Sequence, residues 1–130
     1  MVAVVITHNE AIERAIAEAL AHLPLDALVR GKIVAVKPND TWASPEDVTG
    51  VTQPDTLRAV LRHVRPCGPR ELVVTGGAGA AETEEVFRLA GLMDVVAQEG
   101  ATFFDHNRPP FTKVELEYAP ADDVAGPQGL

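Results

Sequence analysis

Two hydrophobic patterns alternate along the chain. Short apolar runs, most of them rich in β-branched residues, occur at residues 2–6, 33–36, 71–75 and 101–104, and such runs are typical of strands buried inside a sheet. Between them, apolar residues recur at helical spacing within residues 9–23, 54–64, 83–90 and 92–99. Strand and helix therefore alternate four times, which predicts a mainly parallel sheet.

The C-terminal part of the chain follows a different pattern. Val114, Leu116 and Tyr118 alternate with charged residues, as in a half-exposed strand at a sheet edge, so we expect a further strand over residues 113–118. Residues 119–130 have no periodicity and predict a loose tail. The expected fold is one α/β domain over residues 1–118. It is three-layered and Rossmann-like, with a mainly parallel sheet of four to five strands and helices on both faces.

Composition and charge limit the class of protein and its partners. With 130 residues, 46% hydrophobic and 23% charged, the chain has the balance of a soluble single-domain protein. Its net charge of −8 and the lack of a basic cluster argue against nucleic acid as a partner. The apolar runs are too short for a signal peptide or a membrane span, so we expect a cytoplasmic protein with no membrane partner.

The chain holds one cysteine, Cys67. A single thiol excludes an intramolecular disulfide and any cluster held by this chain's own thiolates. No cofactor is therefore predicted for this chain.

Polar residues follow each of the four predicted inner strands. The segments after them are Thr-His-Asn at 7–9, Lys-Pro-Asn-Asp at 37–40, Thr-Gly-Gly-Ala-Gly at 75–79 and Asp-His-Asn-Arg at 105–108. Ligands of open parallel sheets bind outside the carboxyl ends of the strands. The sequence therefore predicts a ligand site where these segments meet.

The residue types in these segments favour a small anionic or phosphorylated ligand. Lys37 would supply positive charge, Asn39 hydrogen bonds, and the amides around Gly76, Gly77 and Gly79 an anion-binding nest. A structural interpretation stands beside this one, because Lys37 can be merely solvated and an asparagine after a proline is a common turn former. The glycine segment lacks the third small residue of the dinucleotide fingerprint and the lysine ending of a P-loop.

A second hypothesis is an enzyme that uses metal assistance or acid–base chemistry through Asp40, Asp105 and His106. These residue types bind divalent metals, but the sequence contains no closely spaced ligand pair such as His-x-x-x-His, so no metal site is assigned. No serine or cysteine is placed as a nucleophile beside them.

Several short motifs occur in the order and spacing of a known family. The chain resembles the N-terminal half of the domain of unknown function 362 family over about residues 2–116, in a strand running into Lys-Pro-Asn, a Thr-x-Pro before a helix, a strand ending in a glycine loop, and a helix closed by glycine. The directly matching residues are Lys37, Pro38, Asn39, Thr52, Pro54, Gly76 and Gly91.

The resemblance adds a third hypothesis. Family members usually continue into a second half, and many carry cysteine-rich segments for iron–sulfur clusters, so such a cluster would belong to sequence absent from this chain. The chain would then be an interaction or assembly module of a larger iron–sulfur-linked protein. Because a half-domain leaves a sheet edge or face for a partner, a homodimer or higher oligomer is expected.

Overall fold

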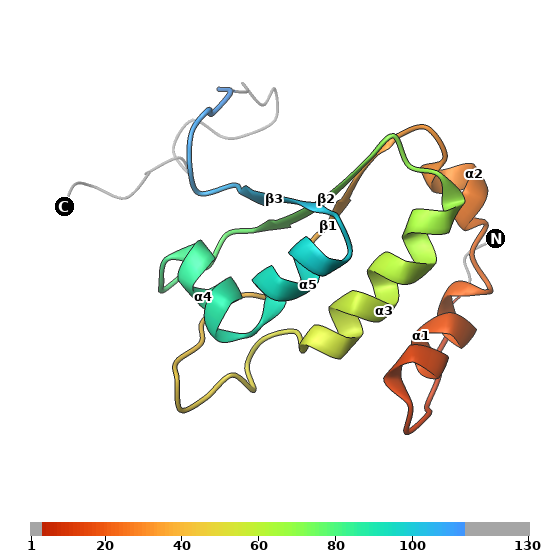
Figure 1. The fold of residues 1–130 in the computed structure, drawn as a ribbon, viewed down its shortest axis with the longest axis horizontal. Coiled ribbons are helices and arrows are strands. Elements are labelled where there is room, and N and C mark those ends of the chain that lie inside the picture. The colour runs from red at the N-terminus through yellow and green to blue at the C-terminus, as the bar shows by residue number, and fades with distance from the viewer. Residues whose placement is uncertain (1–3, 114–130) are drawn as a thin grey trace, which may run out of the picture.

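Three parallel strands and a set of short helices make up the computed structural model, which describes residues 4–113 (Figure 1). In chain order the elements are α1 Ile12–Leu20, α2 Leu25–Val29, β1 Ile33–Val36, α3 Pro54–Val64, the 3-10 turn η1 Arg65–Cys67, β2 Glu71–Gly76, α4 Thr83–Leu89, α5 Leu92–Gln98 and β3 Thr102–Asp105.

The sheet has the strand order β1-β2-β3. Both pairs are parallel, with Val36 opposite Val74 and Gly76 opposite Asp105. The connections run through α3 and through the pair α4 and α5, so strand and helix alternate as expected. The prediction of an α/β fold with a parallel sheet is confirmed.

Local sequence explains where α3 and α5 begin. Pro54 occupies the first turn of α3, where its missing N–H costs no helical hydrogen bond, and Asp55 stands at the positive end of the helix dipole. Gly91 has a φ of +70° between α4 and α5, a conformation that glycine adopts without steric cost. The chain can therefore change direction there and lay both short helices on the sheet.

The core lies between the sheet and the helices. Leu72 and Val74 of β2 are buried, and Val34, Val36 and Phe103 pack against the same cluster. The rings of Phe87 and Phe103 tie α4 to β3, with centroids 4.8 Å apart and planes tilted by 56°. The fully buried helix residues of the core include Leu57, Leu61, Val86, Phe87, Leu92 and Val95.

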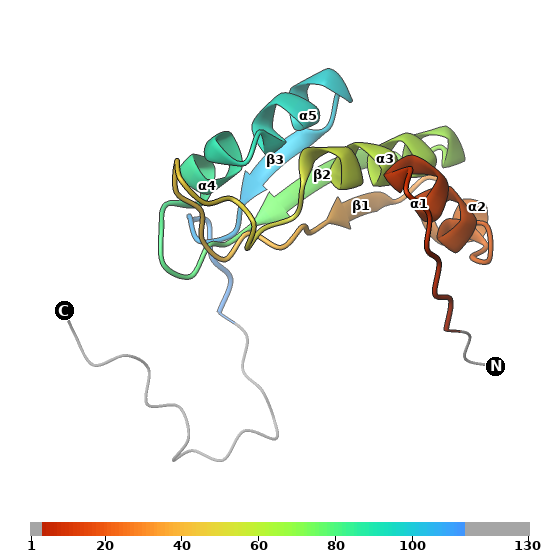
Figure 2. The same ribbon diagram turned by 90° about the horizontal axis from the view of Figure 1, so that it is seen from below.

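The opposite face of the sheet carries no helix among the described residues. Figure 2 shows α3, α4 and α5 on one side, and α1 packs beside α3 instead of behind the sheet. Ile33 and Phe104 point to the uncovered side and remain 55% and 47% exposed. The predicted third layer is therefore not observed among the described residues, which form one layer of strands and one layer of helices. Successive side chains of a strand point to opposite faces, so every second side chain of the sheet faces the helices and the others face the uncovered side.

The predicted strand count is also not confirmed. In the predicted strand over residues 2–6, the described residues 4–6 have no strand structure, and Val4 and Ile6 are exposed. The predicted edge strand over 113–118 lies outside the described residues except for Lys113, which is not in a strand. The error at the N-terminus has a physical reason: strand preference reflects packing against neighbouring strands, and residues 4–6 pair with none.

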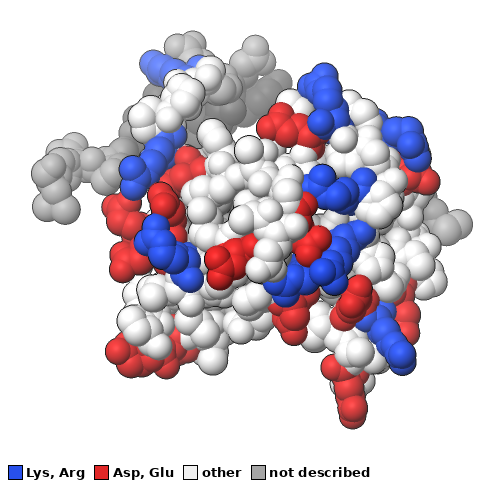
Figure 3. Space-filling view, viewed as in Figure 1, with Lys and Arg blue, Asp and Glu red and all other residues white. Residues whose placement is uncertain are grey.

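Charges of both signs are mixed on the face seen in Figure 3, where Lys and Arg lie among Asp and Glu instead of forming one basic patch. Within residues 4–113, no helix has the length and apolar character needed to cross a membrane.

Candidate functional site

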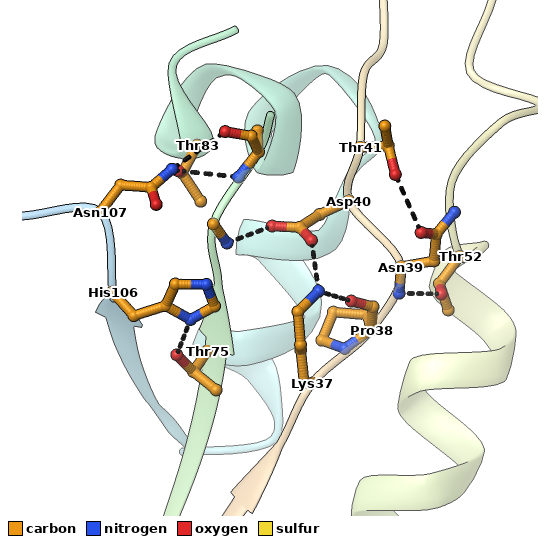
Figure 4. Close-up of polar contacts among 12 residues, drawn as sticks. Lys37, Pro38, Asn39, Asp40, Thr41, Thr52, Thr75, Thr83, His106 and Asn107 are labelled. Atoms are coloured by element: carbon orange, nitrogen blue, oxygen red, sulfur yellow. Dashed lines mark hydrogen bonds and ion pairs between the residues drawn. The ribbon is translucent and has the colours of Figure 1, made fainter. Parts of the chain in front are cut away.

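The carboxyl ends of β1, β2 and β3 lie at one edge of the sheet, because the strands are parallel and in register. Three of the four polar segments after the predicted strands meet there, and Figure 4 shows Lys37, Asp40 and His106 around the start of the glycine segment. The fourth segment, residues 7–9, precedes α1 on the far side of α3. There Asn9 accepts a hydrogen bond from the Ala11 N–H at 2.9 Å. His8 is therefore not part of this edge.

Asp40 joins the segment after β1 to the segment after β2. Its Oδ1 accepts a hydrogen bond from Lys37 Nζ at 2.7 Å, and its Oδ2 accepts one from the Gly77 N–H at 2.7 Å. The side chain of Asp40 is 2% exposed, whereas that of Lys37 is 50% exposed. A buried carboxylate with two charge-assisted or backbone partners is a structural link between loops, and its oxygens are already engaged.

Lys37 stands at the border between this link and solvent. Its ammonium also donates to the Pro38 carbonyl at 3.1 Å. An ammonium has three donors, and these two acceptors hold its position while half of the side chain stays in water. Lys37 is therefore a cation that the fold presents at this edge, next to the glycine segment.

Asn39 fixes the long loop between β1 and α3. Its amide donates to the Gly50 carbonyl at 2.6 Å and its Oδ1 accepts from the Thr41 hydroxyl at 3.1 Å. Its backbone N–H donates to Thr52 Oγ1 at 2.8 Å. The side chain predicted to bind a ligand is thus used inside the loop.

Close approach explains two of the three predicted glycines. A side chain at Gly76 would overlap the Asp40 carboxylate and the Phe87 ring, and one at Gly77 would overlap the His106 ring. A side chain at Gly79 would meet nothing within 4 Å. Gly76 and Gly77 are therefore required by packing, whereas Gly79 is not.

The predicted anion nest is partly occupied by the protein itself. The Gly77 N–H donates to Asp40, and the Ala78 N–H donates to Thr83 Oγ1 at 3.2 Å. Asn107 Nδ2 donates to the Ala78 carbonyl at 2.9 Å from the other side. These contacts hold the glycine segment in place instead of leaving both N–H groups to a ligand.

His106 borders the glycine segment from β3. Its Nδ1 lies 3.2 Å from the Thr75 hydroxyl, and its backbone N–H donates to the Gly76 carbonyl at 2.9 Å. The ring lies against Gly77, whose Cα carries no side chain to block it. The imidazole is exposed and can both donate and accept a hydrogen bond.

Asp105 belongs to a separate ion-pair network. Arg108 Nε lies 3.2 Å from its carboxylate, and the same guanidinium pairs with Glu82 at 2.8 Å. Burial would raise the pKa of Asp105, but hydrogen bonds from the Asn107 N–H, Thr83 and Arg108, together with the Arg108 charge, hold that pKa below its ordinary value. Asp105 is therefore kept ionised.

The described part of the chain contains no group of three or more His, Cys, Asp or Glu arranged to hold a metal ion. Of the candidate trio, Asp40 is engaged by Lys37 and Gly77, and Asp105 by Arg108. His106 alone keeps an exposed functional group.

Sequence reasoning did not assign site roles to Thr75, Thr83 and Asn107. Thr75 and Asn107 lie in the polar segments after the strands, so their positions in the sequence already indicated that they lie near the site. Thr83 is the first residue of α4, and its hydroxyl accepts a hydrogen bond from the Ala78 N–H of the glycine segment. Ala78 and Thr83 are five positions apart, a longer spacing than that of a helix cap, so cap patterns in the sequence do not reveal this hydrogen bond.

Comparison with protein families found one match. Residues 34–126 match the model of the family described as Domain of unknown function (DUF362). Comparison with curated proteins and with solved structures gave no match. The family match spans the whole candidate site and all three strands except Ile33.

Proposed function

The chain belongs to the DUF362 family, whose function is unknown, and we propose from the site itself that it binds a small anionic or phosphorylated ligand at the carboxyl edge of the sheet. One observation carries the proposal. Lys37, half exposed, is held beside the glycine segment by two acceptors, and an ammonium so placed has a third N–H for a ligand oxygen.

The geometry revises which residues would contact the ligand. Lys37 and His106 approach the start of the glycine segment from β1 and β3, with the Thr75 hydroxyl beside the imidazole (Figure 4). Asn39, Gly76 and Gly77 shape this edge through the loop and the close approaches described above. The proposed ligand contacts are therefore Lys37, Thr75 and His106.

The charge of the site favours a small ligand with few charges. Asp40 balances Lys37, and the whole chain carries a net charge of −8, so the long-range field of the protein does not attract anions to the site. Binding would depend on directed hydrogen bonds to an oxyanion more than on bulk attraction. We expect dissociation constants of order 1 mM for inorganic phosphate, near the weak end of the affinity scale.

A second candidate is the assembly module, because the uncovered sheet face exposes apolar residues such as Ile33 and Phe104. The acid–base hypothesis has less support, since the oxygens of Asp40 and Asp105 are engaged within the protein. Both candidates, like the first, agree with the cytoplasmic location that the sequence predicts.

A thermal melt tests the ligand proposal. With a dissociation constant of about 1 mM, phosphate or a phosphorylated metabolite at about 10 mM would stabilise the native state by roughly 1.4 kcal/mol. For a chain of this size that stabilisation raises the Tm by about 4–8 °C. We expect this shift in the wild-type protein and in His22→Ala, a matched control in which an exposed histidine outside the site is removed.

The shift should be lost or reduced in His106→Ala and in Lys37→Ala. His106→Ala is the more specific test of ligand binding, because His106 is exposed and its removal leaves the hydrogen bond between Asp40 and Gly77 in place. Equal Tm shifts in all four proteins, or no shift in any of them with phosphate or with any phosphorylated metabolite tested, would contradict the proposed site.

A further inference from the structure

The uncovered face of the sheet is an apolar surface with a shallow hollow of about 490 Å³. The hollow is lined by Ile33, Ala35, Val73, Thr75, Phe104 and neighbouring residues of the three strands. A face of three strands that exposes Ile33 and Phe104 to water is the kind of patch that soluble proteins usually cover.

We propose that residues 114–126 of the same chain pack on this uncovered face, with Val114, Leu116 and Tyr118 directed into the hollow. The face meets the ligand site at Thr75, which lines the hollow and also lies beside His106, but the test below does not depend on ligand binding. The proposal commits to one occupant for three reasons that follow.

The first reason is the path of the chain. After β3 the described chain leaves the carboxyl edge of the sheet on the uncovered side, opposite the helices (Figure 2). The chain continues for residues 114–130 beyond this point. Five extended residues span about 17 Å, which lies between the lengths of the four-residue strands β1 and β3, about 13 Å, and of the six-residue β2, about 20 Å.

The second reason is the sequence of the segment and its place in the family. Val114, Leu116 and Tyr118 alternate with Glu115 and Glu117, so an extended segment would present one apolar side and one charged side. The family match continues through residue 126. The segment is therefore part of what defines the family domain.

The third reason is the size of the face. Three strands spaced about 4.8 Å apart, of four, six and four residues at about 3.3 Å each, present roughly 220 Å² in projection. A stable interface between two proteins buries about 800 Å² on each partner, several times more. A tethered segment needs less area, because its attachment to Lys113 gives it a high effective concentration at the face.

Thiol protection tests the proposal in the full chain. In a Cys67→Ser background, Ala35→Cys places one thiol in the hollow. We expect this thiol to react with a polar maleimide roughly tenfold slower than a thiol at Ala21→Cys, an exposed position beyond α1, because the bound segment leaves the face open for only about a tenth of the time.

Changing the apolar side of the segment should remove the protection. Val114→Asp with Leu116→Asp is expected to bring the reaction rate at Ala35→Cys up to the reference rate. The matched control, Glu115→Gln with Glu117→Gln, should keep it slow. As a second measurement, Ala35→Cys with Leu116→Cys should form an intramolecular disulfide under mild oxidation faster than Ala35→Cys with Glu117→Cys, because residue 117 would point away from the face.

Three results would overturn the proposal. A fast reaction in every variant means that the face is open. A slow reaction that persists in the aspartate variant, with light scattering at the monomer mass, means that another segment covers the face. The same slow reaction at the mass of a dimer means that a second copy covers it.

Discussion

Replacing Asp40 by alanine should destabilise the protein more than its loop position suggests. The change removes the acceptor of the Gly77 N–H, and leaving a partly buried donor unpaired costs about 1–3 kcal/mol. It also removes the ion pair with Lys37, which adds roughly 0–1 kcal/mol because that lysine is half exposed. The expected loss in the free energy of unfolding is about 1–4 kcal/mol, or a drop in Tm of about 4–16 °C.

Asp40→Asn separates the two contributions. The amide oxygen can still accept from the Gly77 N–H, while the neutral group loses the ion pair with Lys37, so we expect a loss of about 1 kcal/mol. Combining Asp40→Ala with Lys37→Ala should cost less than the sum of the single changes, because the two side chains are in contact.

Urea unfolding followed by far-UV circular dichroism measures these differences. Glu84→Gln serves as the matched control, since it breaks an exposed pair with Arg88 within α4 and should change stability by less than about 0.5 kcal/mol. If Asp40→Ala changed stability no more than Glu84→Gln does, the link between the two loops would not exist as described.

Three further predictions concern the same edge and the thiol at the other end of the sheet. Gly77→Ala should cost about 1–3 kcal/mol because the added methyl overlaps His106, whereas Gly79→Ala, which meets nothing within 4 Å, should change stability by less than about 0.5 kcal/mol in the same unfolding assay. Since the pKa of Asp105 is lowered in the folded state, its contribution to stability is present above the unfolded pKa of about 3.9 and is lost as pH falls through the folded pKa; a pH series of melts should show a steeper acid loss in the wild type than in Asp105→Asn. Burial, followed by the negative charge of a neighbouring aspartate, raises the pKa of Cys67, so its alkylation by iodoacetamide at pH 8 should be slower than that of free cysteine, and an equal rate would contradict this environment.

The pattern of apolar residues predicted the alternation of helices and strands, and three of the four predicted inner strands are observed. Residues 33–36, 71–75 and 101–104 are short apolar runs, and the observed strands β1, β2 and β3 coincide with them to within one residue at each end. Parallel pairing followed from the helices between the runs, because a parallel strand needs a crossover connection. The polar segments after these strands then had to share one edge, which is why Lys37, Asp40 and His106 could be brought together from sequence.

Tertiary structure decided what each residue does at that edge. Asn39 was predicted to bind a ligand and Asp40 to take part in acid–base or metal chemistry, but the folded chain uses them to hold the loop and the glycine segment. Nothing local in the sequence pairs Asp40 with Gly77, since the two are 37 positions apart and meet because β1 and β2 are neighbours.

Tertiary structure also decided the number of strands and the layers. An apolar run such as residues 2–6 has the composition of a strand, yet a strand forms where a neighbouring strand offers hydrogen bonds and packing, and the described residues 4–6 have neither. The alternation within β1 and β3 left Ile33 and Phe104 on a face without helices. Sequence determines which side chains share a face, because strand period is local; what covers that face depends on segments far away in the chain.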